Sequence, residues 1–190
     1  MANNLISRGF LAVFLGCFAM AWIPGCRKWR VKNTKDVLTK ERKNLSLYAL
    51  SIDGIECKQC IGDILVTLRD SHMVRDAECL CQKNDYATAQ IHCFVEKSDQ
   101  FSIPAMSKKL EQHQFVIKSI TGQFTGTVTQ QNNQVFFISP TIGTEVALVY
   151  APEYSARGGA VLAPSDQKKV LSGTLFLDKN QLVVHESIAR

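Results

Sequence analysis

Two cysteines separated by two residues, Cys57 and Cys60, are the side chains with the clearest capacity for chemistry. A thiolate is a soft donor that binds Cu(I), Zn(II) and heavier thiophilic ions, and two nearby thiols can also form a reversible disulfide. Cys60 falls near the predicted start of a helix, where free backbone N–H groups and the helix dipole favour a thiolate. The pair therefore predicts either a site for a soft metal ion or a redox-active dithiol.

The pair lies between two segments of different periodicity. Apolar and polar residues alternate over 47–52, which predicts a strand, and apolar residues recur with helical spacing over about 58–70. Two thiols three positions apart at such a strand-to-helix turn can point at one atom. We therefore expect the two sulfur atoms to converge.

The following segments continue to alternate between strands and helices. A turn at Lys83-Asn84-Asp85 separates the next two strands. Over residues 45–120 the order is β-α-β-β-α-β, the ferredoxin-like arrangement, in which two helices cover one face of an antiparallel sheet. The predicted fold class of this part is α+β. The remaining elements are a strand over 74–82, a strand over 86–95, a helix over 103–113 and a strand over 115–120.

Apolar positions define the expected core of this unit. The first helix carries an apolar stripe, and the second and third strands each carry an apolar face with a two-residue period. Because cysteine is among the most buried residue types, we expect Cys79, Cys81 and Cys93 to pack in this core. The other expected core residues are Ile61, Ile64, Leu65, Leu68, Ala77, Ala89, Ile91, Phe101, Met106 and Leu110.

Residues 45–120 resemble a heavy-metal-associated domain, the module of copper chaperones, mercury-binding periplasmic proteins and the N-termini of metal-exporting P-type ATPases. The family pattern is a strand, then Gly-Met-x-Cys-x-x-Cys, a helix, a β-hairpin, and a second helix that ends near Gly-Tyr or Gly-Phe. The residues of this chain that match the pattern are Gly54, Cys57 and Cys60.

Two positions depart from the family pattern. Ile55 replaces the Met and keeps an apolar anchor under the loop, and Gln114-Phe115 keeps the aromatic residue without the Gly. The resemblance implies that Phe115 packs beside the metal loop, although an ordinary core position is an equally good interpretation.

The resemblance also implies a bound soft ion, which Cys57 and Cys60 hold and pass on by ligand exchange with a partner protein. The ion would be Cu(I), or one of Zn(II), Cd(II) and Hg(II). Glu56 occupies the position at which some zinc, cadmium and lead exporters carry an Asp ligand, so it is either a third ligand or a solvated loop acid. Lys58 either offsets the charge of the thiolates and lowers their pKa or is a plain surface residue.

Residues 121–190 are predicted to be all-β and contain no cysteine. An OB-fold has five strands and often a helix between the third and the fourth, where this chain has the long segment 151–169. We therefore interpret this part as a small OB-like barrel. Its expected strands cover 123–130, 134–139, 145–150, 170–177 and 182–187.

The first 26 residues resemble a bacterial lipoprotein signal. Arg8 precedes an apolar run over 10–23 that is short for a membrane-spanning helix. The run ends in Ile23-Pro24-Gly25-Cys26, which is similar to a lipobox, so cleavage would leave Cys26 as a lipid-bearing N-terminus. A signal without lipid, cleaved or kept as an anchor, is the alternative. The lipid or a signal kept as an anchor predicts a membrane-anchored protein of the bacterial cell envelope.

The positive charge of the chain is concentrated in a predicted tether over residues 27–44. This tether carries eight Lys and Arg against Asp36 and Glu41, whereas residues 45–190 carry thirteen Lys and Arg against fifteen Asp and Glu. Near anionic lipid headgroups each basic residue contributes about 1 kcal/mol. A nucleic-acid partner is disfavoured, because it would need positive charge spread over a docking surface.

Together these features predict a membrane-tethered protein that binds and transfers a soft metal ion, rather than an enzyme. Its partners would be the membrane and a metal-donating or metal-accepting protein. Two other functions stay open. The first is an envelope scaffold or interaction protein with a non-functional heavy-metal-associated domain, which the large second domain favours. The second is a thiol–disulfide oxidoreductase that uses Cys57 and Cys60.

Overall fold

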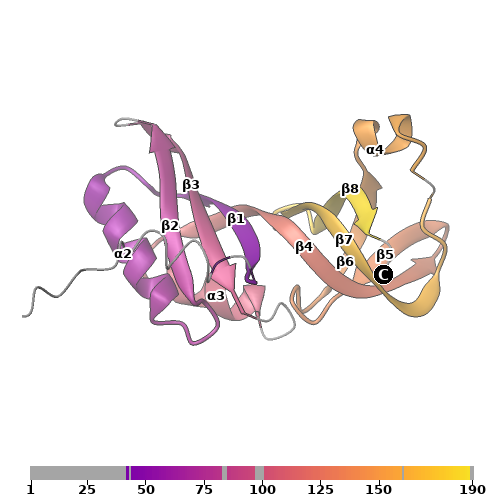
Figure 1. Ribbon diagram of the computed structural model, residues 1–190, viewed down its shortest axis with the longest axis horizontal. Coiled ribbons are helices and arrows are strands. Elements are labelled where there is room, and N and C mark those ends of the chain that lie inside the picture. The colour runs from indigo at the N-terminus through magenta and orange to yellow at the C-terminus, as the bar shows by residue number, and fades with distance from the viewer. Residues whose placement is uncertain (1–41, 43, 83–84, 97–100, 160, 189–190) are drawn as a thin grey trace, which may run out of the picture.

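The structure is a computed structural model that describes residues 42, 44–82, 85–96, 101–159 and 161–188. This part of the chain is mostly β, with eight strands in one mixed sheet and three helices (Figure 1). The elements are β1 (Ser46–Asp53), α2 (Lys58–Arg69), β2 (Asp76–Gln82), β3 (Asp85–Val95), α3 (Ile103–Glu111), β4 (Val116–Gln131), β5 (Gln134–Ile138), β6 (Glu145–Tyr150), α4 (Pro152–Ala156), β7 (Ser165–Phe176) and β8 (Gln181–Ile188).

The first half of the sheet has the strand order β2-β3-β1-β4, and all of its neighbouring strands are antiparallel. The helices α2 and α3 each bury an apolar stripe, which includes Ile64 and Leu68 on α2 and Met106 and Leu110 on α3. Ser102 caps α3 by accepting a hydrogen bond from the backbone N–H of Ala105. The predicted apolar faces of both helices are therefore the ones that are buried.

The long strand β4 runs without a break from the first half of the sheet into the second (Figure 1). The predicted interruption at Thr121-Gly122 is wrong. Gly122 lacks a side chain because Tyr48 packs against it: a Cβ at Gly122 would lie 2.5 Å from Cδ1 of Tyr48. The predicted domain boundary between residues 120 and 121 thus lies inside one strand.

The second half of the sheet closes on itself. β4 pairs with β5, β5 with β6, β6 with β8, and β8 with β7, and β7 pairs back with β4. The β6–β8 pair is parallel and the other pairs are antiparallel. Asn132 and Asn133 both have positive φ and form the two-residue turn of the β4–β5 hairpin. The short helix α4 connects β6 to β7.

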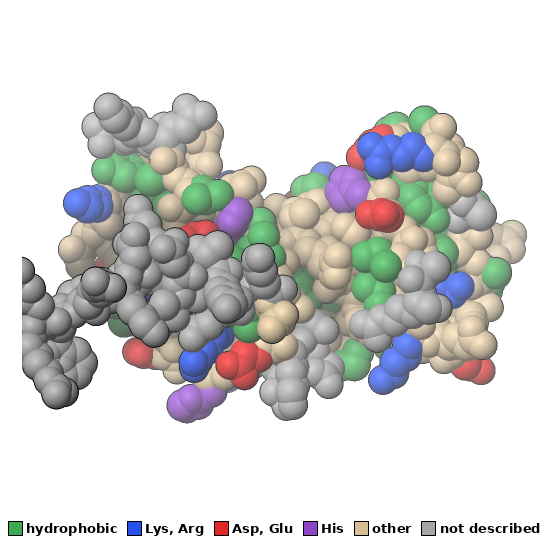
Figure 2. Space-filling model, in the orientation of Figure 1, with side chains coloured by type: hydrophobic (Ala, Val, Ile, Leu, Met, Phe, Trp, Pro, Cys, Tyr) green, Lys and Arg blue, Asp and Glu red, His purple; other side chains and the backbone are tan. Residues whose placement is uncertain are grey.

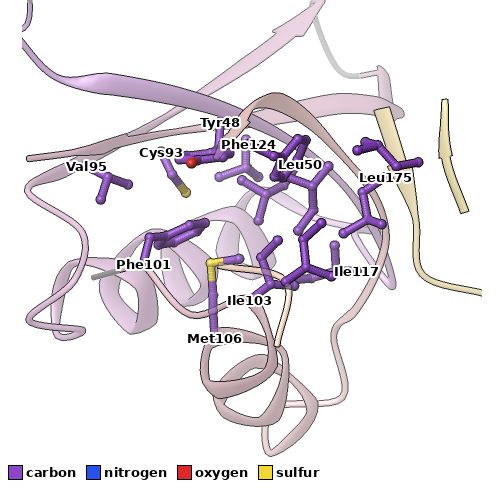
Figure 3. Close-up of a cluster of buried hydrophobic side chains, with 14 of the residues drawn as sticks. Tyr48, Leu50, Cys93, Val95, Phe101, Ile103, Met106, Ile117, Phe124 and Leu175 are labelled. Atoms are coloured by element: carbon purple, nitrogen blue, oxygen red, sulfur yellow. The ribbon is translucent and has the colours of Figure 1, made fainter. Parts of the chain in front are cut away.

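A continuous core extends through both halves. The ring of Tyr48 on β1 stacks on Phe101 with centroids 4.6 Å apart and lies 5.7 Å from the ring of Phe124 on β4. The hydroxyl of Tyr48 donates a hydrogen bond to the carbonyl oxygen of Gln123 at 2.9 Å. Figure 3 shows Tyr48 and Phe101 among the buried side chains of this cluster, which Leu175 of β7 joins from the second half.

The prediction that three sheet cysteines pack in the core is right for Cys93 and wrong for Cys81. Cys93 is fully buried, Cys79 is half-buried and Cys81 is exposed. The alternation of exposure along β2 reaches Leu80, which is 51% exposed, but does not continue to Cys81, which is exposed as well. Cys81 lies near the end of β2, where its pairing with β3 becomes irregular between Leu80 and Gln82.

Candidate metal-binding site

The loop that carries Cys57 and Cys60 connects β1 to α2, and its path is set by Gly54 and Ile55. Gly54 has a φ of 88°, a left-handed conformation that residues with a Cβ rarely adopt. A Cβ at Gly54 would also lie 3.1 Å from the carbonyl oxygen of Gln114. Ile55 is 7% exposed and fixes the loop to the core. The chain therefore leaves the sheet in one defined direction before the first cysteine.

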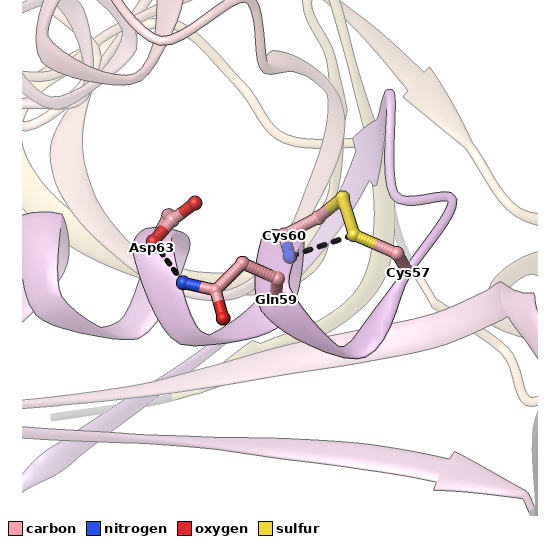
Figure 4. The surroundings of a disulfide bond; sticks show 4 residues. All are labelled: Cys57, Gln59, Cys60 and Asp63. Atoms are coloured by element: carbon pink, nitrogen blue, oxygen red, sulfur yellow. Dashed lines mark hydrogen bonds between the residues drawn. A yellow bond between two sulfur atoms is a disulfide. The ribbon is translucent and has the colours of Figure 1, made fainter.

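The structure brings Cys57 and Cys60 together as a disulfide, with their Cα atoms 5.2 Å apart (Figure 4). Cys57 is the N-cap of α2, and its Sγ accepts a hydrogen bond from the backbone N–H of Cys60 at 3.1 Å. Both residues are half-buried, so the surrounding protein does not enclose the pair. On reduction, the same geometry offers two neighbouring thiols at the start of a helix.

Glu56 and Lys58 flank the first cysteine, and both are exposed. Within the described residues, no three His, Cys, Asp or Glu side chains gather where they could hold a metal ion. Glu56 is therefore not gathered with the cysteine pair, which by itself offers two sulfur donors. On the neighbouring turn of α2, Gln59 donates a hydrogen bond to Asp63 at 3.2 Å (Figure 4).

Phe115 lies beside the loop, at its Gly54 end. Its Cδ1 atom is 3.5 Å from the position that a Cβ on Gly54 would occupy, and the residue is 7% exposed. Gln114 has a φ of 66°, the left-handed conformation in which many helices end and which favours Gly. Gly would adopt this conformation without strain.

A second cysteine pair, which the sequence analysis assigned to the core, lies on β2. Cys79 and Cys81 line a shallow cavity of about 420 Å³ together with Leu80, Thr88 and Gln90. Burial raises the pKa of the Cys79 thiol to about 11, and a hydrogen bond with the Cys81 thiol contributes to the rise. The two-residue period of β2 indicated which face of the sheet these cysteines occupy. It could not show how far along β2 that face is buried.

A polar cluster that no motif in the sequence predicted lies on the second half. His185 Nδ1 lies 2.9 Å from Oε1 of Glu153, and His185 Nε2 lies 3.1 Å from the hydroxyl of Thr174. That hydroxyl is 2.9 Å from the hydroxyl of Thr121. The backbone N–H of Glu153 and then His185 hold the pKa of the Glu153 carboxyl below its usual value. The cluster ties α4 to three strands, β8, β7 and β4.

Arg42, in the predicted tether, is bound to the first half of the sheet. Its guanidinium donates to the carboxylates of Asp76 and Glu78, and it lies 4.2 Å from the ring centroid of Phe94. Asp76 first, and then Glu78, hold the pKa of Arg42 above its usual value. This end of the basic segment therefore docks on β2 and β3. Cys26 and the other residues before Arg42 lie outside the described residues.

Comparisons of the chain with protein-family models, curated proteins and solved structures found no match. None of the helices in the described part of the chain has the length and apolar character needed to cross a membrane. A function for this protein therefore has to be inferred from its own residues and their geometry.

Proposed function

We propose that this protein binds a soft metal ion at Cys57 and Cys60 and transfers it to a partner protein. The observation that carries the proposal is the half-buried sulfur pair at the N-terminus of α2. Free backbone N–H groups and the dipole at a helix start stabilise thiolates. Reduction of the disulfide by two electrons and two protons frees both sulfur atoms, and the bound ion then replaces the protons.

The fold that we assign to the first half supports this function. The element order β-α-β-β-α-β, the sheet order β2-β3-β1-β4 and the antiparallel pairing support the assignment of a ferredoxin-like unit. The resemblance of residues 45–120 to a heavy-metal-associated domain implies the same unit. Gly54, Cys57 and Cys60 would then occupy the metal loop of that family.

We assign the second half to an OB-like barrel. Five strands pair in a closed circuit, and the one helix described among them lies between the third and fourth of these strands. The long strand β4 would then belong to both units. Because β4 is one continuous strand, the second half would hold the metal-binding half in a fixed orientation.

The number of donors favours Cu(I) over Zn(II) as the ion carried by the protein alone. Two thiolates complete the near-linear coordination of a soft monovalent ion, whereas structural zinc sites use four protein ligands. The described residues provide no third ligand beside the pair. A zinc or cadmium ion would have to take further ligands from solvent, from Glu56 after a loop movement, or from a partner.

The surroundings of the loop favour transfer over storage. Glu56, Lys58 and Gln59 are exposed, so thiolates of an acceptor protein could reach the ion and replace Cys57 and Cys60 as ligands. A lipid on Cys26 would keep the protein at the membrane of a bacterial envelope, where metal exporters and acceptors lie. In this proposal the protein is a carrier and catalyses no reaction.

The proposal is tested by anaerobic titration of the reduced full chain with Cu(I), against a competing coloured chelator. We expect tight binding that is lost in the Cys57→Ser, Cys60→Ser variant, while Gln59→Ser, which alters the residue between the cysteines, keeps it. Cys17, Cys26, Cys79 and Cys81 are replaced by Ser throughout, so that this pair alone is measured. Equal binding by the double variant and its parent would refute the proposal.

The disulfide itself favours a second candidate, a thiol–disulfide oxidoreductase. In that case Cys57–Cys60 would accept two electrons and two protons from a dithiol substrate, which would become a disulfide. The reduction potential decides between the two functions. A potential in the range of about −120 to −270 mV supports exchange with substrates, and a potential below about −300 mV counts against it.

A further inference from the structure

The cysteine pair on β2, Cys79 and Cys81, takes no part in the site at Cys57 and Cys60. We propose that Cys79 and Cys81 form a second two-thiol site for a soft monovalent ion such as Cu(I), separate from Cys57 and Cys60. The proposal goes beyond the proposed function, because this site would load even in a chain without the first pair.

The two thiols are close enough to share an ion. Cys79 and Cys81 are two residues apart on β2, and both line the same shallow cavity. Two metal–sulfur bonds of about 2.3 Å place the sulfur atoms at most about 4.6 Å apart. A bound ion would therefore require the two side chains to turn toward each other at this cavity.

The backbone geometry favours a metal site over a disulfide at this place. Two residues of an extended strand span about 6.6 Å, near the upper limit of about 6.8 Å for the Cα atoms of a disulfide. The Cα atoms of Cys57 and Cys60 are 5.2 Å apart and do form one. A disulfide between Cys79 and Cys81 would therefore need a Cα distance near the long end of the usual range.

The site is accessible from solvent. β2 is at the edge of the sheet, Cys81 is exposed, and the cavity of about 420 Å³ lies at the pair. Figure 2 shows hydrophobic side chains at the surface of both halves of the molecule. Cys93, by contrast, is fully buried and could not take an ion without opening the core.

Both cysteine pairs lie toward one end of the sheet. β1 and β2 are each antiparallel to β3, so they run in the same direction, and Ser51 of β1 and Leu80 of β2 both pair with Gln90. α2 begins near the end of the sheet at which β2 stops (Figure 1). An acceptor that docks at this end would therefore face both thiol pairs.

The test uses the full chain with Cys17, Cys26, Cys57 and Cys60 replaced by Ser, titrated anaerobically with Cu(I) against a coloured chelator. We expect this parent to bind about one Cu(I) per chain. Cys79→Ser and Cys81→Ser should each abolish the binding. The matched control is Leu80→Ser, which changes the exposed residue between them and should leave the binding unchanged.

A second measurement needs no substitution beyond those that the parent already carries. Alkylation of Cys81 in the parent, followed by mass spectrometry, should be fast without metal and suppressed by Cu(I). Uptake should also release protons, because a thiol gives up its proton when its sulfur binds the ion. A parent that binds no Cu(I), a Cys81→Ser variant that still binds it, or alkylation that Cu(I) does not slow would each overturn the proposal. These outcomes are independent of Cys57 and Cys60, which the parent lacks.

Discussion

At the residue scale, the loop that carries Cys57 and Cys60 is held by two left-handed residues that lie close to each other. Gly54 has a φ of 88° and Gln114 a φ of 66°. The carbonyl oxygen of Gln114 lies 3.1 Å from the position of a Cβ on Gly54, so the loop fits against the end of α3 only without that atom. A left-handed residue with a Cβ costs about 1–2 kcal/mol, which glycine avoids. Gly54 therefore suits its left-handed conformation, whereas Gln114 is strained in the same conformation.

Replacing Gln114 by Gly should stabilise the protein by about 1 kcal/mol, because Gly adopts the left-handed conformation without strain. Urea unfolding followed by circular dichroism measures the change. The control is Gln112→Gly, at the C-cap of α3 with a φ of −60°, where the added chain flexibility should lower stability instead. A Gln114→Gly variant that is less stable than the parent would show that the side chain of Gln114 matters more than its backbone.

The spacing of two cysteines was enough to predict where the candidate site lies, because a short loop at the start of a helix leaves little freedom to either thiol. The surroundings were harder to predict. Whether Glu56 joins the pair depends on the direction of an exposed side chain, for which the sequence contains no signal. The exposure of Cys81 depends on where the cover of the sheet ends, and a two-residue period shows only which face a residue occupies.

At the element scale, β4 is the feature that joins the two halves. It pairs with β1 near its start and with β5 and β7 further along. The sequence Thr121-Gly122 is a common local signal for the end of a strand, and local patterns alone could not show that Tyr48 fills the space above Gly122. The bounds of β5, β6 and β8 were predicted to within one residue, whereas β7 begins at Ser165 instead of the predicted residue 170. The full length of β4 was therefore not predicted, because Gly122 is required by its contact with Tyr48, a residue far away in the sequence.

A Gly122→Ala substitution should lower the free energy of unfolding by about 1–3 kcal/mol, because overpacking forces neighbouring groups to move. The new Cβ would lie 2.5 Å from Cδ1 and 2.9 Å from Cε1 of Tyr48. The control is Gly62→Ala inside α2, where nothing lies within 4 Å of the added atom. There the higher helix propensity of Ala should raise stability by up to about 1 kcal/mol. Thermal unfolding of both variants compares the effects, and equal stability of Gly122→Ala and its parent would contradict the packing explanation.

At the scale of the whole molecule, the shared core holds two buried groups that titrate at alkaline pH. Burial raises the pKa of Tyr48 to about 12, although a hydrogen bond with Thr141 acts in the opposite direction. Burial also raises the pKa of the Cys93 thiol to about 12. The ordinary values are 10.0 for tyrosine and 9.0 for cysteine. Between the ordinary and the raised values, the folded chain keeps protons that the unfolded chain has released.

The free energy of unfolding should therefore be highest below about pH 9 and should fall as the pH rises toward about 12. It falls wherever the folded state binds more protons than the unfolded state. Cys93 begins the loss and Tyr48 adds to it above about pH 10, so one pH unit above 9 should cost about 1 kcal/mol from Cys93 alone. Urea unfolding across this range measures the slope. Cys79, whose pKa is raised to about 11, contributes a similar loss over this range. Cys93→Ala should therefore reduce the slope between about pH 9 and 10 by about half, even though it lowers stability at every pH. An unchanged slope in Cys93→Ala would show that Cys93 does not contribute to the loss. Because Tyr48 contacts Phe101 on one side and Phe124 on β4 on the other, we expect both halves to unfold in the same transition at each pH.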